Sequence, residues 1–78
     1  MTGRPMKRSL TLRGHRTSVS LEDEFWDAFR LIARDLNRPL NDLAAEIDAE
    51  RGISSGLASA IRVYVLRYYQ SALDESPM

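Results

Sequence analysis

The sequence predicts a mainly α-helical fold with one β-strand, assembled as a homodimer, and three observations lead to this prediction. One short segment alternates polar and apolar side chains, whereas three longer segments repeat apolar residues at helical spacing. The chain has 78 residues and no Cys. Because cores of this size are marginal and disulfides are excluded, a second subunit is the remaining means of stabilisation.

The predicted strand covers residues 15–21. Its two faces differ: Thr17, Val19 and Leu21 alternate with Arg16, Ser18 and Ser20. A lone strand has unpaired backbone groups on both edges, and antiparallel pairing with the same strand of a second chain would satisfy them. An alternative stays open, because Leu10 and Leu12 also alternate and Gly14-His15 could form the turn of a hairpin in a monomeric chain.

Three predicted helices follow, at about residues 22–36, 40–51 and 56–72. Ser20 can cap the first helix, and the acidic residues of its first turn interact favourably with the positive end of the helix dipole. Asn37 and Pro39 end this helix. Gly52 ends the second helix. The third is apolar over more than half of its circumference, so it must pack against other parts of a protein.

Positive charge is concentrated near the N-terminus, although the whole chain is neutral. Residues 1–20 hold five Lys and Arg and no acid, whereas residues 21–78 hold six Arg and eleven Asp or Glu, a net charge of −5. We therefore expect a flexible basic arm at residues 1–8, one domain at residues 9–73 and a tail at residues 74–78. Such asymmetry indicates a nucleic-acid partner.

A two-stranded ribbon fits the major groove of DNA, which gives the polar face of residues 15–21 a function. Arg16 can reach guanine O6 and N7, while Ser18 and Ser20 allow close approach to base edges. Basic side chains and the backbone at the start of the second helix would contact phosphates; these candidates are Arg4, Lys7, Arg8, Arg13, Leu40 and Asn41. The candidates for the dimer core are Val19, Leu21, Phe25, Phe29, Ile32, Ile61 and Val65.

The sequence predicts no catalytic residue, no metal site and no cofactor. It has one His, no Cys and no Gly-rich phosphate loop, so no nucleophile–base pair is available. No run approaches the roughly 18 apolar residues of a membrane span, and no signal peptide is evident. We therefore expect a cytoplasmic protein that is not an enzyme.

The segment HRTSVSLEDEFWDAFRLIARDLNRPLNDLAAEI resembles the ribbon-helix-helix domain family. The residues at 19–21 match the end of the family's strand, and those at 25, 29, 32 and 36 match core positions of its first helix. Asn37 stands where the family usually has Gly, and Asn41 where Ser or Thr usually caps the second helix. The segments KRSLTLRGHRTSVSLEDEFWDAF and ISSGLASAIRVYVLRYY are more closely similar to a subgroup of short bacterial members of unknown function.

The resemblance implies a ribbon-helix-helix fold, an intertwined homodimer with an additional C-terminal helix. It further implies a transcription regulator that inserts its ribbon into double-stranded DNA, with Arg16, Ser18 and Ser20 reading bases. Either of the last two predicted helices could correspond to the family's second helix. The alternative function is a protein-interaction module, antitoxin-like or a scaffold, that dimerises through the ribbon and binds a partner protein.

Overall fold

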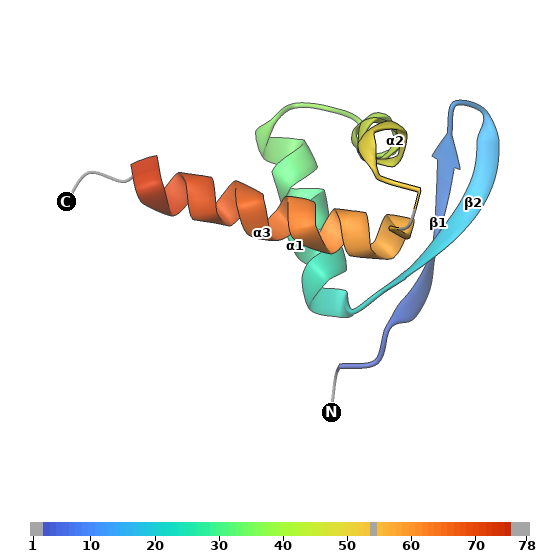
Figure 1. Ribbon diagram of the computed structural model, residues 1–78, viewed down its shortest axis with the longest axis horizontal. Coiled ribbons are helices and arrows are strands. Elements are labelled where there is room, and N and C mark those ends of the chain that lie inside the picture. The colour runs from blue at the N-terminus through green and yellow to red at the C-terminus, as the bar shows by residue number, and fades with distance from the viewer. Residues whose placement is uncertain (1–2, 54, 76–78) are drawn as a thin grey trace.

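The computed structural model describes residues 3–53 and 55–75, which form a two-stranded sheet followed by three helices (Figure 1). The elements in chain order are β1 (Met6–Leu12), β2 (His15–Leu21), α1 (Asp23–Asp35), α2 (Leu40–Glu50) and α3 (Leu57–Glu75). All three helices lie on the same side of the sheet, so the other side of the sheet faces solvent (Figure 1).

Strands β1 and β2 pair antiparallel within one chain, with Leu12 opposite His15 and Met6 opposite Leu21. The two residues between the strands both have positive φ, 51° at Arg13 and 84° at Gly14. Two-residue hairpin loops favour this conformation because its twist matches the twist of the strands. The turn therefore fixes the register of the hairpin.

This hairpin corrects two predictions made from the sequence. The strand at residues 15–21 is paired with β1 of the same chain, so the inference of a second chain from an unpaired strand is wrong. Residues 6–8, assigned to a flexible arm, belong to β1, and residues 1–2 lie outside the described residues. The alternative of an intrachain hairpin is the arrangement found, although its turn is Arg13-Gly14 and His15 already belongs to β2.

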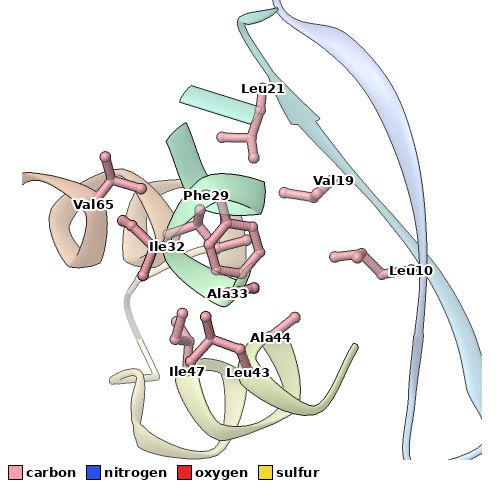
Figure 2. Close-up of a cluster of buried hydrophobic side chains, with 11 residues drawn as sticks. Leu10, Val19, Leu21, Phe29, Ile32, Ala33, Leu43, Ala44, Ile47 and Val65 are labelled. Carbon is pink, nitrogen blue, oxygen red and sulfur yellow. The ribbon is translucent and has the colours of Figure 1, made fainter. Parts of the chain in front are cut away.

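The core lies between the sheet and the helices, and every strand and helix contributes to it (Figure 2). Its buried members are Leu10, Val19, Leu21, Phe29, Ile32, Ala33, Leu43, Ala44, Ile47, Ile61 and Val65. Six of the seven residues assigned to a dimer core are in this set, and the seventh, Phe25, is partly buried at its edge. A single chain already covers these six side chains, so they belong to the core of each chain.

The helix ends differ in detail from the predictions. Glu22 is the N-cap of α1 and its carbonyl accepts the Trp26 N–H at 2.9 Å, so Ser20, which lies in β2, does not cap the helix. Asn37 adopts a left-handed conformation with φ of 55°, as predicted for the end of α1. Helix α3 continues to Glu75, so residues 74–75 are helical and do not belong to a tail.

Two ion pairs join the start of α1 to its neighbours. Arg62 of α3 donates from Nε and Nη2 to Oε1 of Glu22, at 3.1 and 2.9 Å, and its guanidinium carbon lies 5.7 Å from the ring centre of Phe25. A backbone hydrogen bond and the Arg62 hydrogen bond hold the pKa of the Glu22 carboxyl below its usual range. In the second ion pair, Arg8 of β1 donates from Nη2 to Oδ1 of Asp23.

We expect Gly14→Ala to lower the free energy of unfolding by about 1–2 kcal/mol, the cost of holding a residue with a Cβ in the left-handed region. The added Cβ would meet no atom within 4 Å, so the loss is conformational. Gly52→Ala is the matched control, because its Cβ also meets nothing and its φ is outside that region. Urea unfolding measures both variants, and equal stability of the two would contradict the turn.

The Glu22–Arg62 pair predicts that acid destabilises the protein. Because the pKa of Glu22 is lowered in the folded state, its stabilising contribution is complete above the ordinary carboxyl pKa of about 4.3 and is lost as the pH falls through the lower, folded value. Thermal unfolding at decreasing pH should therefore show a smaller loss of Tm in Glu22→Gln than in the unaltered protein. Asp27→Asn, which removes an exposed carboxylate elsewhere on α1, should leave the pH profile unchanged; identical profiles for all three proteins would refute the prediction.

Candidate nucleic-acid interface

The side of the hairpin that faces away from the helices is entirely polar. Residues that pair across an antiparallel ladder point to the same side of the sheet, and three such pairs are Lys7–Ser20, Ser9–Ser18 and Thr11–Arg16. All six side chains are exposed, and none is acidic. We call these six residues the ribbon face.

The three residues predicted to read bases, Arg16, Ser18 and Ser20, are brought together on the β2 half of the ribbon face. The β1 half adds Ser9 and Thr11, which the sequence argument missed, and Lys7, which it assigned to phosphate. The signal for β1 was the alternation of residues 7, 9 and 11 with Leu10 and Leu12. A basic residue at position 8, on the inward face, obscured it.

Positive charge lies at the ends of the ribbon face. Lys7 and Arg16 sit on different strands near opposite ends of the hairpin, Arg4 precedes β1, and Arg13 is at the turn. Within residues 3–53 and 55–75, no carboxylate forms an ion pair with Lys7 or Arg16. Their charges are therefore available to a phosphate backbone.

Arg8, predicted to contact phosphate, lies on the inward face of β1 instead. Its side chain is largely covered and pairs with Asp23, its guanidinium carbon lies 5.5 Å from the ring centre of Trp26, and Nη2 is 3.5 Å from the Leu21 carbonyl oxygen. Nε is buried without a hydrogen-bond partner. Because these contacts hold Arg8 beneath the hairpin, we remove it from the phosphate contacts.

The first turn of α2 lies against the outer edge of β1. The backbone N–H of Thr11 donates to Oδ1 of Asn41 at 3.1 Å, so the Asn41 side chain links the helix to the hairpin. Leu40 is half-buried against the core. Because Asn41 contacts Thr11, the first backbone amides of α2 lie beside one end of the ribbon face. No side chain caps this end of the helix.

Acidic residues limit how far a nucleic acid could extend over α2. Glu46, on the exposed side of α2, accepts a hydrogen bond from Arg38, and this bond, with smaller electrostatic effects of Arg38 and Arg13, holds the pKa of the Glu46 carboxyl below its usual range. Asp42 lies one helical turn before it and is also exposed. Carboxylates at these positions repel phosphates, so the surface that favours a nucleic acid ends at the start of α2.

In the part of the chain that the structure describes, neither a cluster of metal-ligating side chains nor a membrane-spanning helix is present. Within it, no three His, Asp or Glu side chains come together in a way that could hold a metal ion. None of its helices combines the length and the apolar character needed to cross a bilayer.

Comparison with known proteins agrees with the arrangement of the elements. A family model described as the ribbon-helix-helix domain matches residues 5–69, a range that includes both strands, α1, α2 and most of α3. No curated protein and no solved structure matches the chain. Since the match covers most of the sequence, this chain belongs to the ribbon-helix-helix domain family.

Proposed function

We propose that this protein is a homodimeric, DNA-binding transcription regulator that inserts the β1–β2 hairpin into the major groove. Ribbon-helix-helix domains generally serve as DNA-binding regulators or antitoxins. The observation that carries the proposal is the ribbon face itself, which is two-stranded, exposed, polar throughout and free of acidic residues. A major groove about 12 Å wide admits a ribbon of this kind.

Base recognition would come mainly from Arg16. A guanidinium can donate two hydrogen bonds to O6 and N7 of guanine, the commonest specific contact in the major groove. Ser18 and Ser20, together with Ser9 of β1, are short and can donate or accept, so they let the backbone approach but discriminate weakly. The expected binding is therefore selective at few base pairs and depends strongly on phosphate contacts.

Phosphate contacts would surround the ribbon face. Arg4, Lys7 and Arg13 are exposed at its rim, and neutralising phosphates with such cations supplies most of the affinity of DNA-binding proteins. The backbone amides of Leu40 and Asn41, at the start of α2, could bind a flanking phosphate, because the N-terminal end of a helix attracts anions.

Family membership supports the homodimer, because ribbon-helix-helix proteins typically dimerise and bind DNA. In this chain the hairpin is complete without a second copy. A dimer would therefore present two ribbons, each formed by one chain, and not one ribbon shared between chains.

The proposal predicts salt-sensitive binding of a mixed-sequence duplex, measured by fluorescence anisotropy. If Arg4, Lys7 and Arg13 neutralise three phosphates, raising salt from about 50 to about 200 mM should weaken binding by roughly 40-fold, and Lys7→Ala should lower the salt slope by about one. A duplex that shows no binding at the lower salt concentration would refute the proposed function.

Arg16→Ala tests the ribbon face directly. On a site selected from random sequence, this change should cost about 1–3 kcal/mol of binding free energy, the value of one bidentate guanine contact. Arg30→Ala is the matched control, because it removes the same charge from an exposed position on α1. Equal losses for the two variants would show that net charge, and not the ribbon face, determines binding.

A further inference from the structure

The second half of α3 extends beyond the rest of the molecule, at the end opposite the hairpin (Figure 1). The buried residues of α3, Ile61 and Val65, lie in its first half, and every described residue from Tyr69 onward is exposed. Short helices are marginal in water unless an apolar face packs against something. The extension of α3 therefore gains little from the core of its own chain.

An apolar stripe runs along this extension. Leu66 is 55% exposed, Tyr69 41% and Leu73 74%, and their spacings of three and four residues place them on one face of the helix. Arg62 lies one turn before Leu66 on the same face; we call these four residues the α3 stripe. Beside it, Phe25 of α1 joins Leu66 and Tyr69 in lining an apolar groove of about 300 Å³.

We propose that the α3 stripe binds the α3 stripe of a second copy of this chain in an antiparallel arrangement, which rests on the homodimer of the proposed function and supplies its interface. The spacings along the stripe are four, three and four residues, so they read the same from both ends. A two-fold axis between Leu66 and Tyr69 places each Leu66 against Tyr69 of the other copy. Apolar residues at alternating spacings of three and four are those that pack between paired helices.

The same alignment fills the groove beside Phe25. It brings Leu73 of each copy opposite Arg62 of the other, and Arg62 and Phe25 both line that groove. The most exposed apolar residue of the stripe would thus insert next to a half-buried aromatic ring of the second copy. This contact is self-complementary, because each chain supplies one leucine and one groove.

The charges of α3 favour the antiparallel direction. Its cations, Arg62 and Arg67, precede its acids, Asp74 and Glu75, and the last turn has no basic residue. Carboxylates at the C-terminal end of a helix are unfavourable, because this end carries the negative partial charge of the helix dipole. Antiparallel pairing places this acidic end beside the Arg62 end of the other helix, whereas parallel pairing would place the two acidic ends together.

The proposed interface leaves both ribbon faces open. The hairpin is at the opposite end of the molecule from the α3 extension, and its polar side faces away from all three helices (Figure 1). A two-fold axis across the middle of the α3 stripe would therefore hold the two ribbons at opposite ends of the dimer.

Light scattering coupled to size exclusion tests the interface with the full chain at micromolar concentration. We expect a dimer for the unaltered protein and a rise in its dissociation constant of about 30-fold or more for Leu66→Asp and for Leu73→Asp, the effect of about 2 kcal/mol at a central interface residue. Ser71→Asp is the matched control: it adds the same charge at an exposed position on the other side of α3 and should leave the dimer intact. Circular dichroism checks that all variants keep their helices.

Cross-linking tests the direction of the pair, and the absence of Cys from the chain makes single-cysteine variants possible. An equal mixture of Leu66→Cys and Tyr69→Cys should cross-link through a short thiol reagent more efficiently than either variant alone. Efficient cross-linking of each variant with itself would indicate a parallel pair and overturn the proposed arrangement.

Two further outcomes would overturn the interface itself: a monomeric unaltered protein, or a dimer that persists in both Leu66→Asp and Leu73→Asp. Either result would indicate that the α3 stripe binds a partner other than a second copy of this chain. The anisotropy measurement separates this result from DNA binding, since a dimer that fails to bind DNA contradicts DNA binding but not the interface, and a monomer that binds DNA contradicts the interface and the homodimer but not DNA binding.

Discussion

Backbone pairing between β1 and β2 is the constraint on which the rest of the structure depends. It satisfies the inner edge of both strands and fixes which residues face the helices. A slip of one residue would exchange the two faces, placing Ser18 in the core and Val19 in water. The two-residue turn at Arg13 and Gly14 prevents such a slip, so the position of a glycine determines where the protein presents its polar residues.

Ion pairs at the start of α1 join this hairpin to the helices. The adjacent acids Glu22 and Asp23 receive one arginine each, Arg62 from α3 and Arg8 from β1. The sequence explained these acids by the helix dipole alone. In the structure these acids also form the ion pairs that join β1 and α3 to the same helical turn. Two of the basic residues of the chain, Arg8 and Arg62, therefore have a structural role.

The helices could be predicted from the sequence because their apolar residues recur at helical spacing, and the polar half of the ribbon could be predicted because residues 16, 18 and 20 alternate with apolar ones. Strand β1 could be predicted only as an alternative, from the alternation of Leu10 and Leu12, since Arg8 occupies an inward position where an apolar residue is expected. Only contacts far apart in sequence, with Asp23 and Trp26, make that position tolerable. Periodicity likewise showed that Phe29 and Ile61 are buried, but it does not say against which chain.

A ribbon completed inside one chain forms by a unimolecular reaction. Where two chains share a ribbon, the folded state depends on protein concentration, because dissociation removes the structure together with the partner. Here both strands of the ribbon belong to one chain, so their pairing requires no second copy. If the ribbon face binds DNA as proposed, joining two such chains would raise the effective concentration of ribbons near the duplex and so the residence time on it, without being needed to form the ribbon face.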